Sequence, residues 1–240
     1  MNYVYGITGA PVTAPLPPGV GGAPVTQYLA VPDLHVLVSP TDELGPDPTA
    51  ENTLAHHQVL TAAMAAGTVI PFAFGYVLPE ALVHKLAESA REECLKLLPA
   101  LAGKLEVGLK LIWTKAAFLP DIETPEVEAA RKRAEATRGL EAQVGELLQA
   151  AADARRAEYV RLIHEPLAAG AVASRLNETI GPRMILNAAY LLDRAGESEF
   201  DALVGRVCAP CAGKLDIRYT GPWPPYNFVT LRVRLEEGGA

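Results

Sequence analysis

The chain has 240 residues, 50% of them hydrophobic and 20% charged, and a formal net charge of −7 at pH 7. This length and apolar content suffice for two folded domains, each with its own core. Sequence-independent binding to nucleic acid needs a basic face, so the acidic balance predicts no nucleic-acid partner.

The segment 58–79 raises the question of a membrane span, because it contains no formal charge and is long enough to cross a bilayer. Gly67 and Pro71 interrupt it, and its composition changes at Thr68 from alanine-rich to β-branched and aromatic. We therefore interpret it as a helix followed by a buried strand, and predict no membrane partner. The N-terminus lacks the basic and apolar regions of a secretory signal, and three cysteines without an export signal favour the cytoplasm.

The first half alternates short strands with helices. Alternating or β-rich runs predict strands at Tyr3–Thr8, Thr26–Val31, Leu34–Ser39 and Thr68–Phe72. The proline- and glycine-rich stretch Ala10–Pro24 predicts a flexible or polyproline loop without an element of its own. Helices are expected from Glu51 to Ala66, ended by Gly67, and from Pro79, at the first helical position, to Leu101.

A domain boundary is predicted near residue 103, which leaves an N-terminal mixed α/β domain at 1–103 and a second domain at 104–220. The second domain reads as strand Lys104–Trp113, a long helix from about Thr124 to Ile163, strands Gly170–Arg175 and Pro182–Leu192, helix Ser198–Cys208 and strand Lys214–Tyr219. The order β-α-β-β-α-β is that of a ferredoxin-like domain, so the predicted fold class is α+β in two domains.

The segment 220–228, Thr-Gly-Pro-Trp-Pro-Pro-Tyr-Asn-Phe, predicts a rigid corner, because its prolines lack N–H groups and fix φ. It begins the region 221–240, in which a tail strand is expected at Val229–Val233. Two interpretations stay open and are compatible: the aromatics cap the protein's own core, or they form a partner-binding edge. The candidate partner-binding residues are Pro222, Trp223, Pro224, Tyr226 and Phe228.

Cys208 and Cys211 form a C-x-x-C motif, which suggests redox or metal chemistry. The motif lies at the C-terminal end of a predicted helix, where the dipole disfavours a thiolate. A zinc site would need two further ligands, recruited across domains from Cys94 or from His56 and His57. We interpret the cysteines as incidental and keep a metal-binding or redox protein as the alternative.

Other motifs of catalysis are missing from the sequence. His56 and His57 are adjacent, so on a helix they point about 100° apart, and a polar helix surface is expected there. The sequence has no phosphate-binding glycine loop, no nucleophile elbow and no acid within an apolar run. The basic run 131–133 is expected on a solvated face. We predict no enzyme, no cofactor and no metal.

Several segments resemble the gas vesicle accessory proteins of the GvpF/GvpL family. They are the opening strand at 3–7, the helix and turn from His56 through Phe74-Gly75, the strand at 103–110 with Trp113, the run 186–193, and Gly-Pro-Trp-Pro-Pro-Tyr at 221–226. The chain departs from the family at Ala73, where arginine is usual, in the loop 10–24, and after Trp113, where a Tyr-Leu pair is expected.

This resemblance implies a non-enzymatic protein of the gas vesicle, which assists assembly by binding the main gas vesicle shell protein and other accessory proteins. It also implies an N-terminal α/β domain followed by a modified ferredoxin-like domain. A ferredoxin-like ligand-sensing protein with a small molecule in a cleft is a further alternative.

Overall fold

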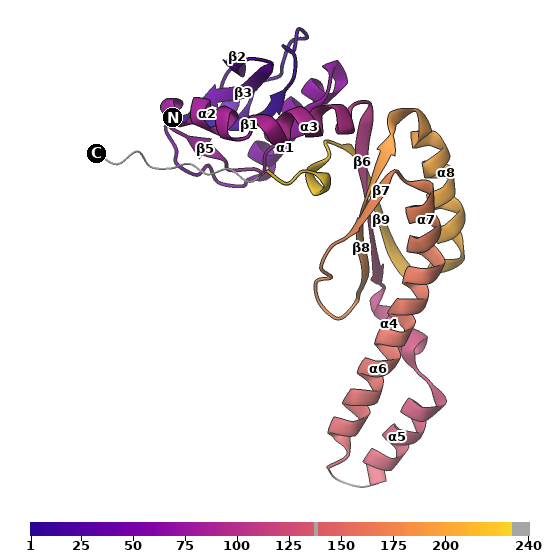
Figure 1. The fold of residues 1–240 in the computed structure, drawn as a ribbon. Helices are drawn as coiled ribbons and strands as arrows, with labels where there is room; N and C mark the ends of the chain where they lie inside the picture. Colours follow the sequence, from indigo (N-terminus) through magenta and orange to yellow (C-terminus); the bar gives the residue numbers. More distant parts are fainter. Residues whose placement is uncertain (137–138, 232–240) are drawn as a thin grey trace. The chain divides into compact units, whose positions relative to one another are not determined.

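The computed structural model describes residues 1–136 and 139–231 (Figure 1). The chain forms two compact units. The first unit contains residues 1–106 and 222–231 of the described chain, whereas the second contains the described residues of 107–221. The polypeptide therefore leaves the first unit, builds the whole second unit and then returns to complete the first.

The first unit contains an antiparallel sheet. Its strands are β1 (Asn2–Thr8), β2 (Thr26–Val31), β3 (Leu34–Pro40), β4 (Val69–Pro71) and β5 (Val77–Leu78). Their order is β2-β3-β1-β4, and β5 pairs with the start of β1. Every residue of β1 after Asn2 is buried. Because successive side chains of a strand point to opposite faces, both faces of the central strand are covered. The four predicted strands are confirmed, with shifts of at most one residue at their ends.

Three helices complete this unit: α1 (Ala50–Ala66), α2 (Glu80–Ser89) and α3 (Arg91–Leu101). The Thr49 hydroxyl accepts a hydrogen bond from the Asn52 amide and so caps α1. The prediction of one helix from Pro79 to Leu101 is wrong, because Ala90 has ψ of −1° and separates α2 from α3. Pro79 is the N-cap and not the first helical residue. No helix among the described residues is long and apolar enough to cross a membrane.

The proline-rich stretch between β1 and β2 is irregular, as expected, but it contains a short 3-10 turn at Val20–Gly22 and is tied to the sheet. The Val20 amide donates to the Tyr5 hydroxyl at 2.8 Å. A Cβ on Gly19 would lie 2.0 Å from the same hydroxyl oxygen, so only glycine fits there. The Gln27 side chain bonds both the amide and the carbonyl of Val12. These contacts replace the predicted flexible loop with a packed one.

The second unit is built on the sheet β7-β8-β6-β9. Its strands are β6 (Lys104–Trp113), β7 (Ala173–Leu176), β8 (Met184–Asp193) and β9 (Leu215–Trp223). Figure 1 shows α7 (Glu165–Gly170) and α8 (Glu197–Cys208) along one side of this sheet. The alternation predicted for β6 is confirmed on one face, where Leu105, Val107, Leu109 and Leu111 are all buried.

The single long helix predicted from about Thr124 to Ile163 is wrong. The chain forms α4 (Lys115–Ile122), α5 (Pro125–Ala136) and α6 (Glu141–Tyr159), followed by a π-helical turn at Val160–His164. Gly139, which has φ of +95°, stands between α5 and α6 in a backbone conformation that interrupts a helix. The two helices pack side by side as a hairpin (Figure 1).

The end of the chain also differs from expectation. Strand β9 does not stop at Tyr219 but continues through Gly221 and Pro222 to Trp223. It is the last strand in the sheet order, where a proline that lacks an N–H is tolerated at the edge. The expected tail strand at Val229–Val233 is wrong for residues 229–231, which have no regular structure, and its other two residues lie outside the described part.

Candidate functional site

The corner at the end of β9 packs into the first unit and is partly open to solvent. Pro224 is buried, and Trp223, Tyr226 and Phe228 are half-buried, whereas Pro222 is exposed. Residues 226–228 form a 3-10 turn. The corner therefore contributes to the core and also presents aromatic surface. Its packing agrees with the first interpretation of its sequence, and partner binding stays a prediction.

Glu106, near the start of β6, holds this corner in place through two hydrogen bonds with Asn227. One carboxylate oxygen accepts the Asn227 amide at 2.8 Å, and the other accepts the Asn227 side-chain Nδ2 at 2.6 Å. Burial raises the pKa of the Glu106 carboxyl, and the two hydrogen bonds from Asn227 offset part of that rise. The expectation that no acid stands buried in an apolar run is wrong, because Glu106 is 4% exposed between Leu105 and Val107.

Helix α1 supplies two histidines beside the corner. His56 is 3% exposed, and its Nδ1 is hydrogen-bonded to the Tyr3 hydroxyl at 2.8 Å. Its ring stacks with those of Tyr5 and Tyr226. The prediction of a polar helix surface is thus wrong for His56, which belongs to an aromatic core. Burial lowers the pKa of the His56 imidazole to about 4, so the ring is neutral at pH 7.

His57 lies at the border of that core. Its ring meets the Trp223 ring edge-on, with 4.2 Å between the centroids, and it is half-buried. Burial also lowers the pKa of the His57 imidazole. His56 therefore lies inside the aromatic core, whereas His57 packs against the corner.

An open cavity of about 690 Å³ lies between α1, the turn after β4 and the corner. Its lining consists of Ala50, Thr53, Leu54, His56, His57, Ala73, Phe74, Trp223 and Tyr226. Leu54 is 55% exposed, so it adds accessible apolar surface at the cavity. All these residues belong to the first unit. The volume is within the range of pockets that accept whole ligands, and the mainly apolar lining suits an apolar occupant.

Two of the five candidate residues from the sequence, Trp223 and Tyr226, line this cavity. Pro224 and Phe228 support the corner, and Pro222 belongs to β9. Sequence reasoning missed Leu54, Ala73 and Phe74 as lining residues, because they lie more than 140 positions before the corner. Leu54 could not be identified from the sequence as a cavity residue, because a leucine on a helix is expected to face the core.

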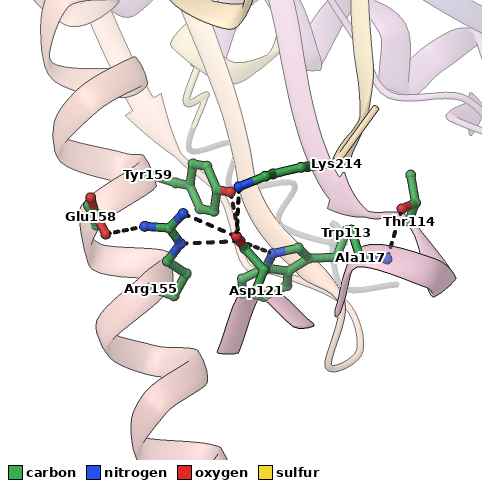
Figure 2. A network of polar contacts seen from close by, with 8 residues as sticks. All are labelled: Trp113, Thr114, Ala117, Asp121, Arg155, Glu158, Tyr159 and Lys214. Atoms are coloured by element: carbon green, nitrogen blue, oxygen red, sulfur yellow. Dashed lines mark hydrogen bonds and ion pairs between the residues drawn. The ribbon is translucent and has the colours of Figure 1, made fainter. Parts of the chain in front are cut away.

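The strongest polar cluster of the second unit surrounds Asp121 (Figure 2). Its carboxylate accepts hydrogen bonds from Trp113 Nε1 at 2.9 Å and the Tyr159 hydroxyl at 2.7 Å. Arg155 donates through Nε and Nη2, and Lys214 lies at 3.4 Å. Burial opposes ionisation of Asp121, but these hydrogen bonds outweigh it and hold the pKa of the carboxyl well below its usual range.

This cluster joins α4, α6 and β6, since Asp121, Arg155 and Trp113 come from these three elements. Both carboxylate oxygens are engaged by donors, and the side chain is 5% exposed. We interpret it as the anchor of the helical hairpin and not as a reactive acid.

Cys208, at the end of α8, and Cys211, in the 3-10 turn that follows, are both buried and unbridged. Burial raises the pKa of Cys208 to about 11 and also raises that of Cys211, which disfavours the reactive thiolate. Cys94, in α3 of the first unit, is buried too. Among residues 1–136 and 139–231, no group of three or more His, Cys, Asp or Glu is placed to hold a metal ion.

Known proteins resemble this chain over almost its full length. Gas vesicle protein F of a Streptomyces species is 30% identical over 95% of this chain and 99% of its own. Gas vesicle protein F2 of Halobacterium salinarum is 28% identical over 98% of this chain and 94% of its own.

Two crystal structures share the fold. That of gas vesicle protein GvpF from Microcystis aeruginosa has a TM-score of 0.82 at 24% identity, over 96% of this chain and 99% of that one. That of GvpF from Anabaena sp. PCC7120 has a TM-score of 0.79 at 25% identity, over 96% of both chains. The family model described as gas vesicle synthesis protein GvpL/GvpF matches residues 1–230. The chain belongs to the GvpL/GvpF family of gas vesicle synthesis proteins.

Proposed function

We propose that this protein is a non-enzymatic gas vesicle accessory protein that assists assembly by binding the main shell protein through the cavity of the first unit. The observation that supports this role best is the mainly apolar cavity, open to solvent and edged by the exposed Leu54 and the half-buried Trp223. A hydrophobic shell subunit needs its apolar surface covered before it joins the wall, and such a cavity offers matching surface.

The aromatic residues of the corner suit this task. Trp223 and Tyr226 are large and amphipathic. The Glu106–Asn227 hydrogen bonds hold the turn that carries Tyr226, and the Trp223 ring packs against His57, so little side-chain entropy is lost when a partner packs against them. The proposed site of action is the gas vesicle and the surrounding cytoplasm, and other accessory proteins are further proposed partners. No catalytic step is proposed, because Glu106 and Asp121 are both engaged as structural acceptors.

We also propose the two-domain description with a modified ferredoxin-like second domain, whose start near residue 104 adjoins the start of the second unit. The sheet order β7-β8-β6-β9 with one helical connection between β6 and β7 and another between β8 and β9 supports it. The modification is the α5–α6 hairpin, inserted in the first of these connections. The corner after Gly221 then belongs to the N-terminal domain in space, although it follows the second domain in sequence.

The test is a pull-down of the tagged protein co-expressed with the main gas vesicle shell protein. Replacing the exposed cavity residue by Leu54→Gln should reduce recovery of the shell protein at least about tenfold. The matched control is Leu95→Gln, because Leu95 lies on α3, is 38% exposed and does not line the cavity. Equal recovery by both variants, or no recovery by the intact chain when both proteins are soluble, would overturn the proposal.

Trp223→Ala separates the two roles of the corner. An interface role predicts lost recovery with a melting temperature that barely changes. A purely core role predicts that the melting temperature falls and that recovery falls in proportion.

A further inference from the structure

Together, the two segments that supply the cavity lining contain acidic residues but no lysine or arginine. The sequence contains no lysine or arginine before Lys85, whereas Asp33, Asp42, Glu43, Asp47, Glu51 and Glu80 all fall in that stretch. The described part of the corner, residues 222–231, has no charged residue. Every lining residue of the cavity comes from one of these two cation-free segments.

Four of the acids cluster in sequence where the chain enters the cavity wall. Asp42, Glu43 and Asp47 lie in the segment that leads into α1, and Glu51 lies in its first turn. All four are exposed. Ala50, Thr53 and Leu54, from the same first turns of α1, line the cavity. An apolar occupant would therefore meet negative charge beside the N-terminal end of this helix.

No histidine charge balances these acids near neutral pH. His56 and His57 both line the cavity, and burial lowers the pKa of each imidazole. The segments that form the cavity thus carry acidic side chains and no lysine or arginine, so a partner with acidic residues would be repelled there and one with basic residues would be attracted.

The lining also indicates the form of the partner. Seven of the nine lining residues come from α1 and the turn after β4, so the walls consist mostly of side-chain surface from a helix and a turn. A partner helix can insert apolar side chains from one face into such a surface while its neighbouring positions remain at the rim.

We propose that the cavity accepts an amphipathic helix with lysine or arginine beside its apolar face, and rejects an otherwise identical helix with acidic residues there. This inference rests on the proposed function, since it specifies the chemistry of the partner segment at the same site. Burial of apolar surface accounts for the affinity, and the charges beside the apolar face determine which apolar helices bind more tightly.

The experiment uses the whole chain and two synthetic helical peptides of about 18 residues, long enough to form a helix. They share one leucine and alanine face and differ only in flanking lysines or glutamates. Because the peptides contain no tryptophan, binding is followed by the emission of the protein, whose two tryptophans are Trp223 at the cavity and Trp113, buried in the second unit. The lysine peptide should bind about tenfold more tightly at low salt, and the preference should shrink as salt is added.

Two variants test the assignment. Asp42→Asn/Glu43→Gln/Asp47→Asn should remove most of the preference while leaving binding itself, whereas Glu88→Gln/Glu92→Gln, on α2 and α3, should leave the preference intact. Leu54→Gln should weaken both peptides together. Equal binding of the two peptides by the intact protein would overturn the charge inference and leave apolar docking in place. Binding of neither peptide would also overturn it, and the shell-protein pull-down would report separately on the proposed function.

Discussion

Glu106 and Asn227 lie 121 positions apart in the chain and are joined by two hydrogen bonds, which engage both oxygens of one buried carboxylate. This pair fixes the turn that carries Tyr226, and therefore one wall of the cavity.

Glu106→Ala should release this turn. A buried hydrogen bond to a charged group contributes about 1.5–3 kcal/mol, so the free energy of unfolding should fall by about that amount or somewhat more. Glu106→Gln keeps one acceptor and should lose less. Urea unfolding of the two variants checks the order. If the alanine variant is no less stable than the glutamine variant, the pair does not hold the turn.

The pH dependence of stability should show the buried His56. Its folded pKa of about 4 lies below the ordinary value of 6.5, so the unfolded chain takes up the proton first as the pH falls. The His56 contribution to stability is present above pH 6.5 and is lost progressively between pH 6.5 and 4, by about 3 kcal/mol in total.

His56→Asn should remove this part of the pH dependence while retaining a polar partner for Tyr3. The free energy of unfolding is measured as a function of pH for the parent and the variant. The other titrating groups contribute equally to both slopes, so their contributions cancel in the difference. Identical slopes would show that His56 does not titrate in this window.

Asp121→Asn should loosen the helical hairpin from the second unit. It removes the charge that Arg155 and Lys214 meet, and leaves Trp113 or Tyr159 with a poorer acceptor. A loss of about 2–4 kcal/mol is expected. Backbone amide hydrogen exchange in the variant should be faster than in the parent protein in α6 and unchanged in α1.

The control for this change is Asp153→Asn, because Asp153 lies on α6 and pairs with Arg156 in an exposed position. An exposed pair contributes little to stability, so this variant should resemble the parent protein. Similar losses in both variants would contradict the anchoring role of Asp121.

Gly19→Ala should disturb the packing of the proline-rich stretch on Tyr5. The added Cβ would lie 2.0 Å from the hydroxyl oxygen of Tyr5, which must then give up its contact with Val20 or move within the core. A loss of about 1–3 kcal/mol is expected from such overpacking. Thermal unfolding of Gly45→Ala supplies the control, because no atom lies within 4 Å of the added Cβ there. An unchanged melting temperature for both would refute the close approach.

The local sequence pattern predicted most of the strands and the limits of α1. Alternation of apolar residues, helix-capping residues and glycines that end helices all act over only a few residues. The pattern failed where the outcome depended on distant partners. Glu106 resembled a solvent-facing residue of an alternating strand, and only the return of Asn227 shows why it is buried. His56 resembled a surface residue until Tyr3 and Tyr226 were placed around it. The cavity escaped prediction for the same reason, since its walls come from segments far apart in the sequence.

Residues 222–231 complete the first unit, so this unit cannot finish folding until they have been synthesised. A ribosome makes the sheet and α1 first, then the whole second unit, and only afterwards Trp223, Tyr226 and Asn227. The wall of the cavity that Trp223 and Tyr226 form is therefore completed only after the whole second unit has been synthesised. Truncation after Gly221 should leave the whole second unit encoded but remove Trp223 and Tyr226, and with them one wall of the cavity.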